Sequence, residues 1–285
     1  MKSDLSLKIK ISFILTVILA VFVYGLRIDR GEFSPLAISH LEQKIGEQYS
    51  RQNMPAENKT EPAETPILVY HSVLPYYPGE SAFKKDYDVE PAMFEQQMLY
   101  LIDNGYQAVS LDDLAEHLIN GLPMPKKSFV MTFDDGWQNQ YTYALPILKK
   151  YNLTATFFIY TNPVGRSPIF MNWNEIKDLD SSGMTIGDHT ESHLYLSPDL
   201  DDKTLRKEII ESKKIIESHL NKEIYFFAYP FYHDTPEAAA IVKEAGFKAA
   251  RAGYSSDKNN LNNIFTLRSI QAPANMKDFI KKINL

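Results

Sequence analysis

The sequence SFVMTFDDG, residues 128–136, joins an apolar run to a charged turn and decides how the rest of the chain is interpreted. The apolar run from Ser128 to Phe133 predicts a β-strand. Adjacent side chains of a strand point to opposite faces, so Asp134 and Asp135 share one cleft only if the chain turns at this point. Gly136 provides the backbone freedom for that turn.

Other apolar runs predict seven further strands, which alternate with helices in the part of the chain after Pro66. The predicted strands cover residues 67–70, 107–109, 154–160, 184–187, 224–229, 247–250 and 265–270. Helix signals lie between most of them: Pro91 to Asn104-Gly105, Ser110 to Gly121, Thr235-Pro236 to Gly246, and a last helix capped by Asn275. About eight alternating units favour a βα barrel over an open doubly wound sheet. No glycine-rich phosphate loop follows a strand, which disfavours a nucleotide-binding fold.

The composition excludes several classes of function. The 285-residue chain has a net charge of −6 and no basic cluster beyond its N-terminus, so nucleic acid is not an expected partner. It contains no cysteine, which excludes disulfides, thiolate metal sites and cysteine nucleophiles. Any metal must be held by histidines and carboxylates.

The N-terminus predicts a membrane segment. Lys2, Lys8 and Lys10 precede an apolar run over residues 11–26, which predicts a signal anchor, with a cleaved signal peptide or a core helix as alternatives. The lysines would stay in the cytoplasm, so the rest of the chain would lie outside the cell membrane, or be secreted after cleavage. We therefore expect an anchor region at 1–26, a polar extracytoplasmic linker at 27–65 and one folded domain at 66–285.

Four polar clusters directly follow predicted strands. They are His71, the Asp134-Asp135-Gly136 turn, the pair His189 and His193, and the segment Tyr229-Pro230-Phe231. The C-terminal ends of barrel strands meet on one face, so these clusters are expected to converge there.

The aspartates and the two histidines predict a catalytic metal site. One aspartate and two histidines spaced four residues apart supply three ligands and leave a position for water. The alternative is that the two aspartates cap a following helix. Of the other histidines, His40, His117 and His219 are expected on linker or helix surfaces, while His233 stays an open candidate for the site.

Three of these segments resemble the signature motifs of the NodB-homology polysaccharide deacetylases, the family-4 carbohydrate esterases. They are Thr132-Phe133-Asp134-Asp135-Gly136, the His189-Thr190-x-x-His193 pattern and Ala228-Tyr229-Pro230-Phe231, and the resemblance runs from about Pro66 to the C-terminus. It implies a distorted (β/α)7-8 barrel, a divalent metal, commonly zinc, and hydrolysis of acetyl groups on sugars. By position, Asp134 would be the general base. Asp135, His189 and His193 would bind the metal, and the Phe231 N–H would help to form the oxyanion hole.

The chain departs from the family pattern in two places. Ala228 stands where the family usually has an arginine, and no histidine follows His233, so the late Leu-x-x-His motif is missing. However, Val69-Tyr70-His71-Ser72 resembles the branch that deacetylates poly-β-1,6-N-acetylglucosamine, in which the acid histidine comes early. His71 is then the expected general acid, with a core histidine as the alternative. Arg268, on the last predicted strand, is the candidate to replace the missing arginine by holding Asp134.

The expected function is removal of N-acetyl groups from an extracellular N-acetylglucosamine polysaccharide, with a metal-bound water as nucleophile. Aromatic side chains are candidates to line a sugar groove: Tyr76, Tyr77, Trp173, Tyr195 and Tyr232. Trp173 has the alternative role of a hydrophobic staple for the helix that starts near Asn174. The alternative functions are an O-deacetylase of a wall polymer and a catalytically silent carbohydrate-binding protein on the same barrel. The oligomeric state is left open.

Overall fold

The computed structural model describes residues 64–76, 87–254 and 258–283. The predicted anchor at 11–26, the linker up to residue 63, His40 and Tyr77 lie outside these ranges, so the predicted domain boundaries stay predictions. Among the described residues, no helix has both the length and the apolar composition needed to cross a membrane.

The β-sheet closes on itself at β5 (Ser128–Phe133), whose six residues are all buried. One edge of β5 pairs in parallel with β1 (Ile67–Tyr70), from Ile67 opposite Val130 to Tyr70 opposite Phe133. The other edge pairs with β4 (Gln107–Val109) along its first half and with β6 (Thr156–Ile159) at its last two residues. Burial on both faces explains why β5 is a continuous apolar run rather than an alternating one.

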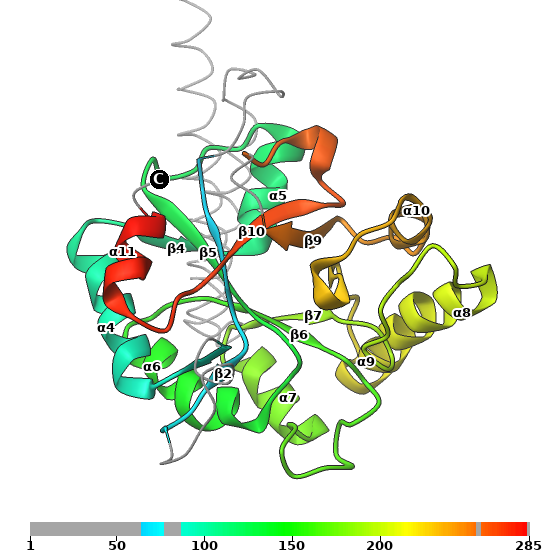
Figure 1. The fold of residues 1–285 in the computed structure, drawn as a ribbon, viewed down its shortest axis with the longest axis horizontal. Coiled ribbons are helices and arrows are strands. Elements are labelled where there is room, and N and C mark those ends of the chain that lie inside the picture. The colour runs from blue at the N-terminus through cyan, green and yellow to red at the C-terminus, as the bar shows by residue number, and fades with distance from the viewer. Residues whose placement is uncertain (1–63, 77–86, 255–257, 284–285) are drawn as a thin grey trace, which may run out of the picture. The chain divides into compact units, whose positions relative to one another are not determined.

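The remaining strands complete a barrel. From β6 the sheet continues in parallel through β7 (Thr185–Asp188), β8 (Phe226–Ala228), β9 (Ala249–Tyr254) and β10 (Leu267–Gln271) to β1. The β1–β5 pairing closes a ring of seven strands, and β4 is attached outside this ring (Figure 1). The prediction of a βα barrel is confirmed, with seven strands in the barrel itself.

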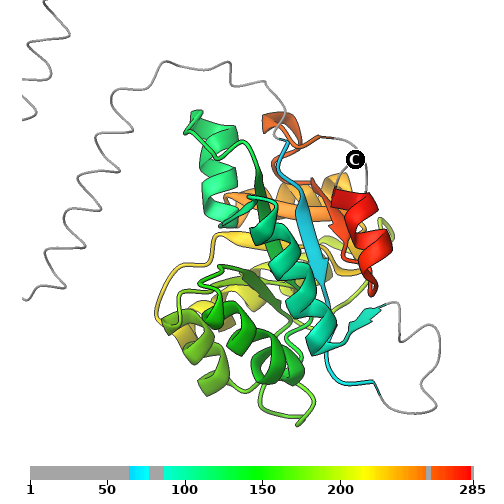
Figure 2. The ribbon, with the colours of Figure 1, turned by 90° about the vertical axis from the view of Figure 1, so that its left-hand side faces the viewer.

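Helices connect the strands: α4 (Pro91–Asp103), α5 (Leu111–Asn120), α6 (Leu145–Lys150), α7 (Trp173–Ser181), α8 (Asp202–Arg206), α9 (Ser212–Leu220) and α10 (Pro236–Glu244). A last helix, α11 (Met276–Ile283), follows β10. The predicted cap of α5 is present, because Ser110 Oγ accepts the Asp113 N–H at 3.0 Å and Asp113 Oδ2 accepts the Ser110 N–H at 2.8 Å. Figure 2 shows α4 and α11 on the side of the barrel where β1 lies, and the rings of Tyr100 and Phe279 join these helices.

The strand residues pack in two buried clusters. Phe157 and Phe227 belong to the cluster that packs against most of the helices, whereas their neighbours Phe158 and Phe226 belong to the cluster that contains α5. This alternation is the period of two that a strand imposes on its side chains. Phe133 stacks on Phe157 with ring centroids 4.7 Å apart, so the end of β5 and the start of β6 are held together next to the polar turn.

Several short elements were not predicted from the sequence. They are the parallel pair β2 (Ser72–Val73) and β3 (Asp88–Val89), the π-helical turns η1 (Gln140–Ala144) and η2 (Lys207–Glu211), and the 3-10 turns η3 (Pro230–Tyr232) and η4 (Leu261–Asn263). Two of them, η1 and η2, contact polar residues at the strand ends, and η3 contains part of one polar cluster.

Candidate active site

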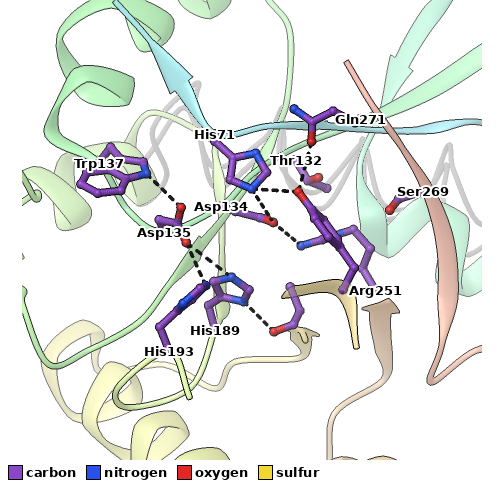
Figure 3. A network of polar contacts seen from close by, with 12 residues as sticks. His71, Thr132, Asp134, Asp135, Trp137, His189, His193, Arg251, Ser269 and Gln271 are labelled. Atoms are coloured by element: carbon purple, nitrogen blue, oxygen red, sulfur yellow. Dashed lines mark hydrogen bonds and ion pairs between the residues drawn. The ribbon is translucent and has the colours of Figure 1, made fainter. Parts of the chain in front are cut away.

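Side chains from three separate strand ends point toward one another at one end of the barrel (Figure 3). His71 follows β1, Asp134 and Asp135 follow β5, and His189 and His193 follow β7. The structure thus brings together residues that are far apart in the sequence and that sequence analysis placed at strand ends. Their chemical roles stay predictions.

The chain turns at Asp135, as the adjacent aspartates require. Asp135 has a left-handed backbone with φ of +74°, and Gly136 follows with φ of +71°. A Cβ atom at Gly136 would also lie 3.0 Å from the Ile159 side chain, so glycine is required there for conformation and space. Asp134 continues the strand pairing, because its N–H donates to Tyr70 O at 2.9 Å. The turn therefore separates the two carboxylates.

Asp135, His189 and His193 form a compact group of ligand atoms. Asp135 Oδ1 lies 3.6 Å from His189 Nε2 and 3.2 Å from His193 Nε2, and the three atoms all lie within 4.8 Å of one another. The second carboxylate oxygen, Oδ2, accepts the indole N–H of Trp137 at 2.9 Å, which fixes the rotation of the carboxylate. Burial raises the pKa of Asp135, but a hydrogen bond from His193 and the charge of His189 outweigh it, so the pKa lies well below its usual range.

His189 is held in the protonation state that a metal ligand needs. Its Nδ1 lies 2.6 Å from Ala228 O. A carbonyl oxygen can only accept, so Nδ1 carries the proton and Nε2 keeps its lone pair. Burial lowers the pKa of His189 to about 4, although the charge of Asp134 opposes this shift, and the ring is neutral at pH 7.

The loop that carries His193 is tied to the π-helical turn η2. The N–H and the hydroxyl of Ser192 donate to the Glu208 carboxylate at 2.9 and 2.7 Å. The His193 N–H donates to Thr190 Oγ1 at 3.0 Å, and both residues have positive φ angles of +59° and +74°. The two histidines therefore lie in a braced loop rather than on one face of a helix.

This donor set fits a divalent metal ion. One carboxylate oxygen and two imidazole nitrogens suit zinc and similar cations, and three protein ligands leave a coordination position open, as catalytic sites require. The Ala228 carbonyl and the Trp137 indole supply the hydrogen bonds that orient the ligands.

Asp134 forms a buried ion pair with Arg251 of β9, and this corrects the prediction for Arg268. Arg251 Nη2 lies 2.6 Å from Asp134 Oδ2. Arg268 instead lies 3.6 Å from Asp234, where both side chains are about 30% exposed. The other oxygen, Asp134 Oδ1, is buried and has no hydrogen-bond partner in the described part of the chain. Oδ1 is thus available to accept a proton.

His71 lies near the same oxygen of Asp134 that Arg251 contacts. Its Nε2 is 3.9 Å from Asp134 Oδ2 and 2.8 Å from the hydroxyl of Tyr232, and its side chain is 15% exposed. Gln140 of η1 donates through Nε2 to the backbone carbonyls of both His71 and Asp134 at 2.5 Å. The buried Gln140 amide therefore fixes the two strand ends relative to each other.

The remaining predicted site residues have different surroundings. Phe231 is 56% exposed, and its ring centroid lies 4.7 Å from that of His193, so the Phe231 side chain is next to one of the candidate metal ligands. His233 stacks on Tyr195 with centroids 4.6 Å apart, beside the site but not among the ligands. Tyr232 was expected to line a sugar groove, and its hydroxyl forms a hydrogen bond with His71 Nε2.

Trp173 is explained by packing, though not as the staple. It is the first residue of α7, whose N-cap is Asn172, so the staple position before the cap belongs to Met171. The Trp173 ring stacks at 3.9 Å on the imidazole of His219 in α9. It therefore joins two helices, and no contact among the described residues brings it to the ligand group.

Sequence analysis missed Arg251, Gln140 and Glu208. Arg251 had a visible signal, because it is a charged residue within the apolar run Ala249-Ala250-Arg251-Ala252. Glu208 and Gln140 carried no comparable signal, since both lie in amphipathic helical segments where polar residues are ordinary.

The chain is similar to several known proteins. Residues 121–250 match the family model for polysaccharide deacetylases. A putative polysaccharide deacetylase of Bacillus subtilis, YxkH, is 30% identical over 191 residues, which are 67% of this chain and 65% of that protein. A poly-β-1,6-N-acetyl-D-glucosamine N-deacetylase of Staphylococcus aureus is 28% identical over 185 residues, 61% of this chain and 63% of that protein. The chain thus spans less than two thirds of both relatives. The structure of the deacetylase PplD of Streptococcus pyogenes, in complex with acetate, superposes with a TM-score of 0.72 and 27% identity, over 78% of this chain and 99% of that one.

Proposed function

The chain belongs to the polysaccharide deacetylase family, and we propose that it hydrolyses N-acetyl groups of an extracellular polysaccharide that contains N-acetylglucosamine. The main support for this proposal is that two adjacent carboxylates, Asp134 and Asp135, have different surroundings. The Asp135 carboxylate lies next to the His189 and His193 imidazoles. One oxygen of Asp134 contacts the Arg251 guanidinium, and the other is buried without a hydrogen-bond partner in the described region. Such a pair suits one metal ligand and one general base.

The base in this proposal is Asp134. A divalent cation at Asp135, His189 and His193, which we propose to be zinc, would polarise the acetamide carbonyl and make the attacking water more acidic. Asp134 Oδ1 would take the proton from that water. Arg251 compensates the charge of Asp134 from the opposite oxygen, so the arginine does not compete with the water for Oδ1.

The acid in this proposal is His71. Hydrolysis of an amide needs a proton on the departing nitrogen, and an imidazole can supply it at neutral pH. His71 Nε2 lies 3.9 Å from Asp134 Oδ2, so the proposed acid is next to the proposed base. The backbone N–H of Phe231 is the proposed oxyanion donor. Its residue has a φ of +55° and lies against His193, which supports this position.

A row of aromatic rings beside the ligand group supports a carbohydrate substrate. The ring of Phe231 contacts those of His193 and Tyr195, and Tyr195 stacks on His233. Phe231 and Tyr195 are 56% and 45% exposed. Such exposed aromatic rings can stack on the apolar faces of sugars. We propose that this row binds a sugar unit next to the one that is deacetylated, and that the substrate is therefore a polymer.

The poly-β-1,6-linked glucosamine polymer is our first candidate substrate, because the relative from Staphylococcus aureus carries that name. We further propose that the domain acts outside the cell and stays attached through residues 11–26. The support for this location is the apolar run that follows Lys2, Lys8 and Lys10.

The experiment that tests the function is mass spectrometry of N-acetylglucosamine oligomers before and after incubation with the metal-loaded protein. We expect a mass decrease of one acetyl group per event, with free amine in the product. An O-acetylated wall polymer serves as the second substrate. Acetyl loss from that polymer alone would favour the O-deacetylase alternative, and loss from neither would favour a silent carbohydrate-binding protein.

A further inference from the structure

The contact between Tyr232 and His71 has no role in the mechanism proposed above. The Tyr232 hydroxyl lies 2.8 Å from His71 Nε2 and 3.1 Å from Gln271 Oε1 of β10. The same ring lies under a cation, because the guanidinium carbon of Arg251 is 5.3 Å from the ring centroid. One side chain thus contacts both the proposed acid and the arginine that holds the proposed base.

The backbone of Tyr232 is in a conformation that must be maintained by its surroundings. Phe231 and Tyr232 are consecutive non-glycine residues with φ of +55° and +60°. Such left-handed residues are unfavourable for bulky side chains and persist where the structure over-determines them, often at functional sites. The neighbouring strand accommodates this turn through Gly253, because a Cβ atom there would lie 3.0 Å from the Tyr232 carbonyl oxygen.

The imidazole of His71 needs an orienting partner at its Nε2 end. Acid–base histidines are often fixed through the ring nitrogen that does not react, but in His71 that nitrogen, Nδ1, cannot do this. His71 Nδ1 is buried and has no hydrogen-bond partner in the described part of the chain. The contacts that can fix the ring are therefore the Tyr232 hydroxyl, the carboxylate of Asp134 at 3.9 Å and the edge of Tyr87, with centroids 5.1 Å apart.

A hydroxyl can serve both protonation states of this histidine. When Nε2 carries a proton, the Tyr232 oxygen can accept a hydrogen bond from it, and the Tyr232 hydroxyl can donate a hydrogen bond to Gln271 Oε1. After Nε2 has given its proton away, the hydroxyl can rotate and donate to the nitrogen lone pair. A phenylalanine ring would fill the same space and do neither.

We propose that Tyr232 is a positioning residue: its hydroxyl holds the Nε2 end of the His71 ring until the leaving group replaces the hydroxyl as the acceptor of the Nε2 proton. The inference rests on the proposed function, because it assigns Tyr232 a task only if His71 is the acid. It goes beyond that function by making the orientation of the acid depend on η3, the turn that also carries Phe231.

The test compares Tyr232→Phe with Tyr151→Phe in metal-loaded, full-length protein. Tyr151 is a matched control, because it is also half-buried and its hydroxyl donates to a side-chain carboxylate, Glu95, at 2.7 Å. We expect Tyr232→Phe to keep its metal and its unfolding midpoint. Its kcat on the N-acetyl oligomer should fall by about tenfold or more, with KM little changed. This loss should be smaller than the roughly 10²–10⁴-fold loss expected when a general acid is removed. The kcat on an aryl acetate should fall less, because the leaving group of that substrate departs without a proton.

The outcomes separate the two proposals. A Tyr232→Phe variant with the kcat of Tyr151→Phe on both substrates would overturn the role of Tyr232 and leave the deacetylase function standing. Equal losses of kcat on oligomer and aryl ester would also overturn it, since they indicate a general structural defect. A wild-type protein that acts on neither substrate would overturn the proposed function itself. As a readout without turnover, the nitrogen-15 resonance of His71 Nε2 should move in Tyr232→Phe, and an unchanged resonance would contradict the positioning role.

Discussion

Arg251 Nη2 lies 2.6 Å from Asp134 Oδ2, and the side chains are 0% and 2% exposed. The contact joins β9 to the end of β5 across 117 residues of sequence. A charge buried without a partner costs several kcal/mol, so each member of the pair makes the burial of the other tolerable. Because the arginine occupies only one carboxylate oxygen, the pair also leaves Asp134 Oδ1 for chemistry.

Replacing Arg251 with methionine should destabilise the fold by about 3–5 kcal/mol, because it leaves the Asp134 carboxylate buried without a counter-charge. Denaturant unfolding measures this loss. Arg268→Met is the matched control, since its partner Asp234 is 3.6 Å away and both are partly exposed. That variant should lose less than about 1 kcal/mol. Similar losses in the two variants would contradict the importance of the buried pair.

Alanine at Asp135, His189 or His193 should sharply weaken metal binding, because a site with three protein ligands cannot spare one. Elemental analysis after dialysis measures occupancy. His117→Ala is the control. The Nδ1 atom of His117 contacts the backbone carbonyl of Leu122, five residues further along the chain, so this substitution should not affect metal binding. Full occupancy in the three ligand variants would refute the metal assignment.

Asp134→Asn should keep its metal and lose most of its activity. The amide is nearly isosteric with the carboxylate but cannot take a proton from water at working pH. Acetate release and metal content are measured on the same preparation. Near-wild-type turnover would show that another group is the base.

His71→Ala should keep its metal and lose roughly 10²–10⁴-fold in turnover of the N-acetyl substrate. An acetyl ester with a good phenolic leaving group should lose much less, because the phenolate departs without a proton. The informative quantity is the ratio of the two rates on one folded protein. Equal losses would argue against His71 as the acid and make His233, which stacks on Tyr195 nearby, the next residue to test.

Local sequence signals were sufficient to predict the barrel and the convergence of Asp135, His189 and His193 at one end of it. Strands buried on both faces are continuous apolar runs, so β5 and the polar turn after it could be found from residues 128–136 alone. Where the predicted strand ends differ from those in the structure, the difference is one or two residues in most cases. The exception is β9, which extends to Tyr254. The convergence of Asp135, His189 and His193 was predictable because these residues lie directly after strands whose ends must meet in a closed barrel.

The supporting contacts could not be predicted, because they depend on which strands become neighbours. Arg251 reaches Asp134 only once the ring has closed, and a sequence pattern does not say whether Arg251 or Arg268 faces the carboxylate. Gln140 bonds two backbone carbonyls from different strands, and its π-helical turn does not follow from helix propensity. The hydroxyl of Tyr232 likewise meets His71 across 161 residues.

Acetate release before and after metal removal tests the central claim most directly. The protein is incubated with N-acetylglucosamine oligomers in three states: metal-loaded, stripped by a chelator, and reloaded with zinc. The account predicts equal amounts of acetate and free amine from the loaded protein, no release from the stripped protein, and recovery on reloading. Undiminished acetate release from protein verified as metal-free, or no release in any of the three states, would contradict it.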